Sequence, residues 1–409
     1  MSTYKPDQPV VIGYANSVPA SKTLFSLHSA NKSNKAPITL VTGNTGSGKT
    51  YCMLWLTTLA AIQGATIVGI DWKGDLLKLA GAEDITGVPV RRAKIDPTDP
   101  ENIGILDPFI VFSHGEDKKQ IESDTVTAVL AVLQALLPNS VNDDIIVGQI
   151  SNTVRDILNF HNDEKCMIAF LDELQRTASL IDDPVGRSKL FGFAKAARNA
   201  LTAGAGEILS AEPDKGEPKY IKFQPGITVI DLSDLHELPK TIDELKDPSK
   251  AVGQAIMTML TLLIRQSMFR LDESIRKVLV VDEAWSIITN PTGAALIDTT
   301  ARLGRSKNLA LLLGTQNYTD IFNERTRLNK AFASTHFAFN NSEDDAIVAA
   351  NAMQVKGDAA AQVIEAITTL PQGWCLMRDI RGRRGQVRID IWLEELPEIF
   401  NTNPLTDNT

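Results

Sequence analysis

Short continuous apolar runs alternate with longer helical patterns in the first part of the chain. Residues 38–42 (ITLVT), 65–71 (ATIVGID) and 88–96 (VPVRRAKID) each have the pattern of a strand. Residues 49–63 are apolar on more than one side, which indicates a helix buried against a sheet. Residues 71–81 (DWKGDLLKLAG) predict a short second helix. The order strand, helix, strand, helix, strand predicts a parallel, doubly wound α/β sheet.

A helical pattern alone fills the block from residue 115 to residue 212. Apolar residues recur every three or four positions in 121–137 and again in 146–158. Further helices are expected in 172–181 and from 187 to 203. Because strand signals surround this block on both sides, it predicts an all-α insertion within an α/β domain.

Strand and helix patterns alternate again in the second half. Residues 226–232 predict a buried strand and residues 250–269 a long amphipathic helix. The pattern then predicts a strand at 277–281, a helix at 294–307, a strand at 309–316, a strand at 334–341, a helix at 342–353 and two last strands at 374–379 and 386–392. The IRGRRG sequence between the last two strands predicts a β-hairpin.

These patterns divide the chain into five parts. The expected division is a lead-in with a strand or two at 1–36, the first part of the core at 37–114, the all-α insertion at 115–212, the second part of the core with its C-terminal hairpin at 213–400, and a polar tail at 401–409. A chain of 409 residues is long enough for one large α/β domain that carries such an insertion.

Composition narrows the class of protein. The chain is 43% hydrophobic and 22% charged, as in ordinary globular proteins, and its net charge of −9 gives no overall basic field for nucleic acid. Three widely separated cysteines suit a reducing compartment. No apolar run approaches the roughly 18 residues of a membrane span, and the N-terminus does not resemble a signal peptide. We therefore expect a cytoplasmic protein that reaches a membrane only through partners.

The strongest motif is GNTGSGKT, which lies between the first predicted strand and the first predicted helix. In that context glycines let backbone N–H groups surround phosphate, and the helix N-terminus adds partial positive charge. Lys49 would reach the β- and γ-phosphates of a nucleotide, and the Thr50 hydroxyl would bind Mg²⁺. The predicted nucleotide-binding residues of this loop are Gly43, Asn44, Thr45, Gly46, Ser47, Gly48, Lys49, Thr50 and Tyr51.

A second motif places two acids at the end of the apolar strand 277–281. Parallel strands deliver their carboxyl ends to the crevice where ligands bind. We assign Asp282 to Mg²⁺ and Glu283 to polarising the attacking water. The alternative is that both acids merely cap the next helix, and the phosphate loop weighs against it.

Two further residues complete the predicted catalytic set. Gln316 ends the strand 309–316, where an amide senses the γ-phosphate or positions water; polar capping of the strand is the alternative. Arg302 and Arg305 lie at a helix end, and Arg305 is the candidate for stabilising negative charge in a neighbouring subunit. Exposed helix arginines without such a role are the alternative.

The C-terminal hairpin is rich in arginine. Arg378 is a candidate nucleotide contact, and the other arginines are Arg381, Arg383, Arg384 and Arg388. Three readings stay open for this hairpin: a second phosphate-contacting element, a nucleic-acid patch, or a solvated hairpin that holds a subunit interface.

The motifs GNTGSGKT, IDWKGDL, LDPF, VLVVDEAW, GRSKNLALLLGTQN and LPQGWCLMRDIRGRRG, in this order, resemble the HerA/FtsK superfamily of P-loop ATPases. Within it they look like the TraC-like ATPases of conjugative type IV secretion, over residues 37–395, which correspond to that family's C-terminal ATPase domain. The resemblance implies a RecA-like core with a mostly parallel sheet and an inserted all-α subdomain. It also implies a hexamer in which Arg305 acts across the subunit interface.

That family usually has a long N-terminal domain, whereas only 36 residues precede the core here. This departure suggests an excised or stand-alone ATPase domain, or a shorter relative. The expected partners are further copies of the chain and inner-membrane components of a secretion channel; DNA contact stays open. The expected location is the cytoplasm, or the inner face of the cytoplasmic membrane through these partners.

The main functional hypothesis is an ATP- and Mg²⁺-dependent motor of a conjugative secretion apparatus. It would couple hydrolysis in a ring to pilus or channel assembly and substrate transfer. The first alternative is a DNA translocase or coupling protein of the same superfamily. The second is a nucleotide-binding regulatory module with little turnover, against which the complete set of Lys49, Asp282, Glu283 and Gln316 argues.

Overall fold

The computed structural model describes residues 8–33, 35–113, 117–138, 141, 143–160, 165–202, 204–211, 220–235, 247–289, 291–322 and 332–401. Contacts divide it into two compact units: unit 1 comprises Met1–Lys94, Phe223–Ser233 and Gln266–Thr409, and unit 2 comprises Ile95–Lys222 and Asp234–Arg265. The predicted boundaries beside residues 115 and 212, and residues 402–409 of the polar tail, lie outside the described residues.

Unit 1 contains one eleven-stranded sheet in the order β2-β1-β11-β10-β9-β3-β8-β7-β4-β6-β5. Its strands are β1 (Val10–Ala15), β2 (Ser21–Phe25), β3 (Ile38–Thr42), β4 (Thr66–Asp71), β5 (Val90–Lys94), β6 (Ile227–Asp231), β7 (Lys277–Val281), β8 (Leu309–Thr315), β9 (Thr335–Phe339), β10 (Trp374–Arg378) and β11 (Arg384–Ile389). The pairs from β9 to β5 are parallel. The mostly parallel α/β sheet is therefore confirmed.

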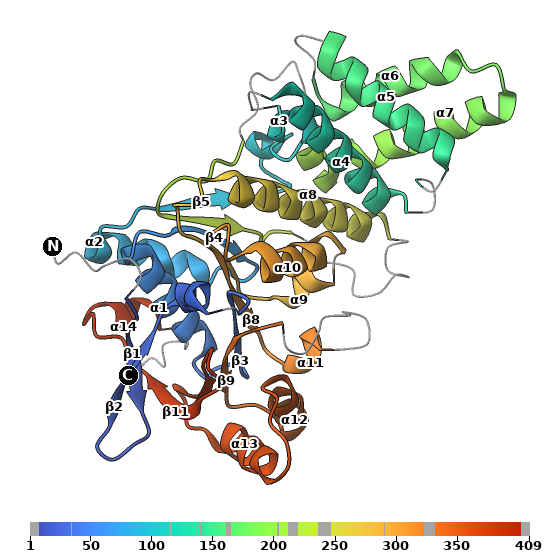
Figure 1. Cartoon of the computed structure of the whole chain (residues 1–409). Helices are drawn as coiled ribbons and strands as arrows, with labels where there is room; N and C mark the ends of the chain where they lie inside the picture. The colour runs from blue at the N-terminus through green and yellow to red at the C-terminus, as the bar shows by residue number, and fades with distance from the viewer. Residues whose placement is uncertain are drawn as a thin grey trace, which may run out of the picture. The chain divides into compact units, whose positions relative to one another are not determined.

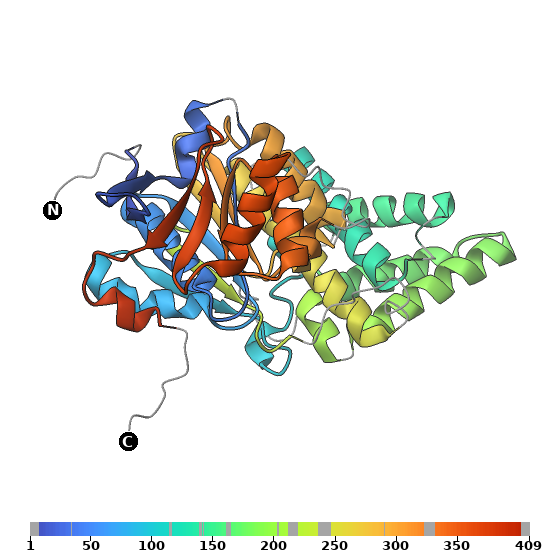
Figure 2. The same cartoon turned by 90° about the horizontal axis from the view of Figure 1, so that it is seen from below.

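The remaining pairs, from β2 to β9, are antiparallel. The predicted C-terminal hairpin is confirmed as β10 and β11, with Arg378 opposite Arg384. Figure 2 shows these two strands, in red, beside the N-terminal strands β1 and β2, in dark blue. The N-terminal lead-in thus extends the same sheet, because β1 pairs with β11.

Helix α1 (Lys49–Ile62) is the central helix of the core of unit 1 (Figure 1). Its burial on nearly all sides confirms the prediction from its apolar pattern. Alternate residues of the neighbouring strands face the same cluster, as the two-residue period of a strand requires: Val41, Ile67, Val278, Val280, Ala310 and Leu312. Each fully buried aliphatic side chain of this kind contributes roughly 1.5–3 kcal/mol relative to exposure.

The other helices of unit 1 follow the strands along the chain. They are η1 (Leu27–Lys32), η2 (Leu76–Ala82), α2 (Glu83–Thr86), α9 (Trp285–Ile288), α10 (Pro291–Leu303), α11 (Tyr318–Ile321), α12 (Glu343–Ala352), α13 (Asp358–Thr369) and α14 (Leu396–Ile399). The short helix expected from residue 71 begins only at Leu76, because the Asp71 carboxylate accepts three N–H groups of the intervening turn. Helix α13 was not predicted.

The regular elements among the described residues of unit 2 are all helices. It contains η3 (Pro100–Asn102), α3 (Pro108–Val111), α4 (Lys118–Leu136), α5 (Asp144–Phe160), α6 (Met167–Ser179), α7 (Pro184–Leu201) and η4 (Gly204–Leu209), several of them drawn in green in Figure 1. Helix α8 (Pro248–Arg270) belongs to unit 2 up to residue 265. Among the helices of the described ranges, none combines the length and apolar character of a membrane span.

A buried carboxylate holds the ends of several elements in unit 2. Asp107 caps α3 by accepting a hydrogen bond from the Phe109 N–H, at 2.9 Å. Its other oxygen accepts from the Met167 and Ala211 N–H groups, both at 2.8 Å. Burial raises the pKa of Asp107 to about 7, although these N–H donors act in the opposite direction. The LDPF motif thus fastens the start of α6 to the segment that follows η4.

Candidate active site

The glycine-rich loop joins β3 to α1 in a backbone shape that only glycine adopts easily. Gly46 and Gly48 have φ values of +78° and +109°. A Cβ on Gly48 would also lie 3.1 Å from the Gly373 Cα and 3.2 Å from its nitrogen. The sequence therefore needs glycine at this position for two reasons, the positive φ and the close approach of the turn before β10.

Hydrogen bonds hold both ends of this loop to neighbouring strands. The Gly43 N–H donates to the Gln316 carbonyl at 3.3 Å, and the Asn44 N–H donates to the Asn340 carbonyl at 3.0 Å. The Ser47 carbonyl accepts from the Gly373 N–H at 2.9 Å. The loop is thus positioned by β8, β9 and the start of β10, while the first N–H groups of α1 have no partner within the helix.

The register of the parallel strands brings the acidic positions beside this loop. Thr42 lies opposite Thr315, and Val281 lies opposite Leu313 on one side and Ile70 on the other. The residues that follow these positions at the carboxyl edge include Gln316, Asp282 and Asp71. The structure therefore brings the predicted Asp282, Glu283 and Gln316 to the same edge as the phosphate loop.

Lys49 and Asp282 form a buried ion pair, with 2.7 Å between Nζ and Oδ1. The second oxygen of Asp282, Oδ2, is buried and has no hydrogen-bond partner, and the Ser47 hydroxyl is in the same state. A buried acceptor without a partner costs about 1–3 kcal/mol, so these atoms indicate a site shaped for an additional group.

These atoms fit Mg²⁺ held together with a phosphate. Oxygen ligands at an open position are what Mg²⁺ prefers, and it usually keeps several waters. The Thr50 hydroxyl at the start of α1 and the unpaired oxygen of Asp282 are the oxygen donors that the chain offers. The described residues contain no group of three or more His, Cys, Asp or Glu side chains suited to a metal. Most of the coordination would therefore come from phosphate and water.

Glu283 makes an ion pair with a residue that the sequence did not single out. Its Oε1 pairs with the Lys73 ammonium, and its Oε2 accepts from the Trp285 indole N–H at 3.1 Å. Glu283 is 6% exposed and Lys73 is 43% exposed. Burial lowers the pKa of Lys73, but the hydrogen bond to Glu283 and the negative charges of Glu283, Asp282 and Asp75 together outweigh this effect, so the pKa is raised overall.

Asp71 holds the turn that carries Lys73. Its carboxylate accepts hydrogen bonds from the N–H groups of Lys73, Gly74 and Leu76, at 3.1, 2.9 and 2.7 Å. Burial raises the pKa of Asp71, and the nearby Asp282 adds to the rise. The motif IDWKGDL offered a signal for this role, because an Asp at a strand end followed two residues later by Lys and then Gly is typical of a tight, Asx-type turn.

A pocket of about 290 Å³ lies beside the phosphate loop. It is lined by Gly46, Gly48, Tyr51, Gln372, Gly373, Pro397, Phe400 and Asn401. Tyr51 is half-buried, and burial and then the charge of Asp390 raise its pKa, so the phenol stays protonated. The predicted Tyr51 therefore lies in this pocket. The sequence did not predict the lining residues from the turn before β10 and from α14 and its C-terminal end, which are Gln372, Gly373, Pro397, Phe400 and Asn401.

The structure does not bring the two predicted arginines to the phosphate loop of their own chain. Arg305 lies in the turn before β8, and the loop lies at the other end of that strand, about 20 Å away at ~3.3 Å per residue. Arg378 ends β10, opposite His336, whereas Gly373 at the start of β10 contacts the loop. The Arg378 guanidinium donates to the Ser334 carbonyl at 3.4 Å.

Comparison with known proteins identifies the family of this chain. The model of the AAA-like domain family matches residues 24–400. The uncharacterized protein YddE of Bacillus subtilis (strain 168) is 22% identical over 375 residues, which are 88% of this chain and 42% of that protein. The chain thus spans less than half the length of this curated relative.

Solved structures share the fold at low sequence identity. VirB4 of Thermoanaerobacter pseudethanolicus has a TM-score of 0.68 and 16% identity, over 95% of this chain and 98% of that one. The plasmid coupling protein TrwB with the GTP analogue GDPNP has a TM-score of 0.55 and 14% identity, over 94% and 95%. TrwB with ADP and Mg²⁺ has a TM-score of 0.51 and 15% identity, over 87% and 85%. The chain belongs to the AAA-like domain family, and its fold is that of the RecA-like P-loop ATPases VirB4 and TrwB.

Proposed function

We propose that this chain binds Mg²⁺-ATP at the phosphate loop and hydrolyses it. The observation that carries this proposal is the pair of acids at the end of β7, one bound to Lys49 of the loop and the other buried beside it. A glycine-rich loop alone binds phosphate, but hydrolysis needs a group that activates water next to it. Glu283 is the acid in that position.

Each residue then has a defined task. Lys49 exchanges its bond to Asp282 for the β- and γ-phosphates, which leaves both Asp282 oxygens available. Thr50 and Asp282 hold Mg²⁺, which neutralises developing charge on the phosphates when bound. Glu283 orients the attacking water and accepts its proton. The Gln316 carbonyl accepts a hydrogen bond from Gly43, the first residue of the loop, and this neighbourhood supports the assignment of the Gln316 amide to sensing the γ-phosphate.

The pocket beside the loop is the proposed nucleoside site. It offers the Tyr51 and Phe400 rings, the Pro397 ring and the Gln372 amide around one cavity. Apolar ring side chains with the two amides of Gln372 and Asn401 suit a purine base and its sugar. TrwB has been solved with both GTP and ATP analogues, so the base that this chain prefers is a question for measurement.

The broader role is that of a motor in a conjugative or type IV secretion apparatus, acting as a ring, expected to be a hexamer. The fold shared with VirB4 and TrwB supports this role. The position of Arg305, at the other end of β8 from its own loop, agrees with an arginine that acts in a neighbouring subunit. Inner-membrane channel components are the proposed partners, and the inner face of the cytoplasmic membrane the proposed location.

A DNA translocase is the second candidate. The arginines exposed on the C-terminal hairpin and the fold of the coupling protein TrwB favour it. The net charge of −9 weighs against it, since nucleic-acid binding depends on dense positive charge.

Steady-state ATP hydrolysis tests these proposals. The rate is measured for the wild type, Glu283→Gln and the exposed control Glu273→Gln, over a range of protein concentrations, with and without single- and double-stranded DNA. Loss of a general base lowers such rates about 10²–10⁴-fold, so Glu283→Gln should be nearly inactive while binding of a fluorescent ATP analogue persists. The control should match the wild type.

The outcomes separate the hypotheses. Turnover that rises cooperatively with protein concentration and ignores DNA supports a secretion motor. Strong stimulation by DNA supports the translocase. Tight nucleotide binding with no turnover at any concentration would sink the hydrolysis proposal and leave a regulatory module.

A further inference from the structure

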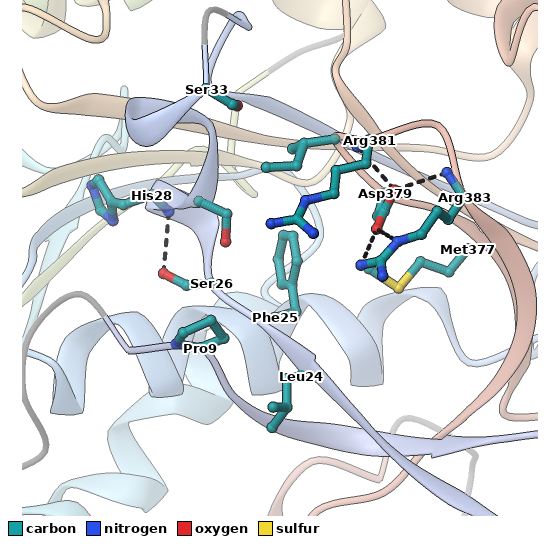
Figure 3. Close-up of a pocket in the computed structure, with 12 residues that line it drawn as sticks. Pro9, Leu24, Phe25, Ser26, His28, Ser33, Met377, Asp379, Arg381 and Arg383 are labelled. Carbon is teal, nitrogen blue, oxygen red and sulfur yellow. Dashed lines mark hydrogen bonds and ion pairs between the residues drawn. The ribbon is translucent and has the colours of Figure 1, made fainter.

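A second and larger pocket lies away from the phosphate loop. Its volume is about 370 Å³, and it lies between the end of β2 with the following η1 and the turn of the C-terminal hairpin. It is lined by Pro9, Leu24, Phe25, Ser26, His28, Ser29, Ser33, Met377, Asp379, Ile380, Arg381 and Arg383 (Figure 3). Since β10 starts at the phosphate loop and ends at this turn, the two pockets lie at opposite ends of that strand.

The walls of this pocket are apolar on one side and hydroxyl-bearing on another. Phe25 is buried and packs edge-to-face on Phe337, with 5.3 Å between ring centroids, so it forms a fixed wall. Leu24 beside it is 57% exposed, an unusually open position for a large aliphatic side chain. Ser26, Ser29 and Ser33 supply hydroxyl groups from η1 and its flanks. Such a lining suits an apolar group that carries a polar end.

Arg381 provides the charge of the pocket from a rigid turn. The Asp379 carboxylate accepts hydrogen bonds from the N–H groups of Arg381 and Arg383, both at 2.9 Å, and pairs with the Arg383 guanidinium at 2.7 Å. Gly382, at φ +81°, completes the turn. These bonds fix the backbone that carries Arg381, so little ordering is needed when its side chain binds a ligand.

The Arg381 guanidinium itself has no hydrogen-bond or ion-pair partner among the residues that the structure describes. Figure 3 shows it directed toward the middle of the pocket, near the Phe25 ring. The other charged and titratable groups of the lining are engaged. Asp379 is neutralised by Arg383, and the His28 Nε2 donates to the Lys277 carbonyl at 3.2 Å. The pocket therefore presents one unmatched positive charge beside an apolar wall.

An open strand edge adjoins this pocket. β2 stands at the end of the strand order and pairs only with β1 among the described strands. The last two residues of β2, Leu24 and Phe25, also line the pocket. An extended peptide can add to such an edge through main-chain hydrogen bonds while its side chains enter adjacent pockets.

We propose that this pocket and the β2 edge bind an extended segment of a partner protein in which an acidic residue lies two positions after a large apolar one, because side chains two residues apart on a strand point to the same face. The apolar side chain packs on Leu24 and Phe25, and the carboxylate pairs with the Arg381 guanidinium, whose planar fork suits a carboxylate. This interaction is independent of the nucleotide site.

Fluorescence anisotropy with defined peptides tests the proposal. The probe is a fluorescein-labelled hexapeptide, Thr-Phe-Val-Glu-Val-Thr with blocked ends, and its partner probe has Gln in place of Glu. A hydrogen bond to a charged group contributes enough for about a tenfold loss of affinity in Arg381→Gln and a similar loss for the Gln peptide. Arg384→Gln, an exposed arginine on the same hairpin outside the pocket, is the matched control and should bind like the wild type.

Three results would overturn the proposal. They are no binding of the Glu peptide to the wild type up to about 1 mM, equal binding by Arg381→Gln, and equal loss in Arg384→Gln. In the first of these cases, binding of 3-phenylpropionate would mark a small-molecule site instead. Arg381→Lys, which keeps the charge but not the fork, should bind between the wild type and Arg381→Gln. ATP hydrolysis measured on the same samples should be unchanged by Arg381→Gln, so failure of one proposal is distinguishable from failure of the other.

Discussion

Two lysines from different loops each hold one acid at the end of β7. Lys49 of the phosphate loop binds Asp282, and Lys73 of the turn after β4 binds Glu283. In the proposed reaction, Lys49 exchanges its bond to Asp282 for bonds to the phosphates of the nucleotide. Lys73 has no such partner and is therefore a positioning residue for Glu283.

Replacing Lys73 by Met should lower kcat by about tenfold with a smaller change in KM, because Glu283 loses the partner that orients its carboxylate. Steady-state kinetics over a range of ATP concentrations measures both constants. Lys73→Arg should restore part of the rate, since it keeps the positive charge. A rise in kcat, or an effect confined to KM, would contradict the assignment. Lys22→Met, which replaces an exposed lysine of β2 outside both pockets, is the control.

Gly48→Ala should reduce nucleotide affinity, because the loop would have to move. A non-glycine residue at positive φ costs roughly 1–3 kcal/mol, and the new Cβ would also crowd Gly373 at 3.1 Å. Titration with a fluorescent ATP analogue measures the affinity, with about a tenfold loss expected.

Gly64→Ala is the matched control outside the loop. Gly64 follows the same helix at φ +82° and has open space around its Cβ position. It should lower the melting temperature but leave nucleotide affinity unchanged. If both variants bound the nucleotide like the wild type, the close approach of Gly373 would not matter for binding.

At the scale of elements, one carboxylate links three segments of unit 2. The Asp107 side chain accepts from N–H groups of α3, α6 and the residue Ala211. Because burial raises its pKa to about 7, the folded state holds a proton on Asp107 that the unfolded chain, with a pKa near 3.9, has already released. Stability from this group is therefore present below about pH 4 and falls as the pH rises toward 7.

Asp107→Asn has no group to titrate there, so its stability should lack this dependence. The free energy of unfolding of the wild type minus that of the variant should fall by a few kcal/mol between about pH 4 and pH 7 and level off above. Urea unfolding at several pH values measures the difference. A difference that rises with pH would contradict the raised pKa.

At the scale of the whole molecule, the proposed role of Arg305 requires a second copy of the chain. The phosphate loop and Arg305 lie at opposite ends of β8. If Arg305 serves the next subunit, mixing two inactive variants should restore activity. Arg305→Ala supplies an intact Glu283, and Glu283→Gln supplies an intact Arg305, so about one quarter of the sites in a randomly mixed ring are complete.

ATP hydrolysis by the mixture, compared with each variant alone, measures this complementation. Arg302→Ala, which removes a surface arginine paired with Asp298 on the same helix, should keep wild-type activity and serves as control. An Arg305→Ala variant with full activity, or a mixture no more active than its components, would rule out action between subunits.

Local signals in the sequence determined much of this molecule. The period of apolar residues predicted α1, α4, α5, α7 and α8, because amphipathic or fully apolar helices carry that period themselves. The glycines of the phosphate loop and the two acids after β7 were recognisable because a strand, a turn and a helix follow each other directly. The turn between β10 and β11 was predictable because the IRGRRG sequence separates two adjacent strand patterns.

Only the tertiary structure decided which residues far apart in sequence meet. Lys73 joins Glu283 through the pairing of β4 with β7, and Gly373 reaches the loop because β10 pairs with β9. Arg305 and Arg378 lie in two of the motifs that resemble the family. The direction of their strands nevertheless places both away from the phosphate loop of their own chain. A sequence specifies periods and turns residue by residue, whereas strand order and register depend on contacts between distant segments, which no local pattern encodes.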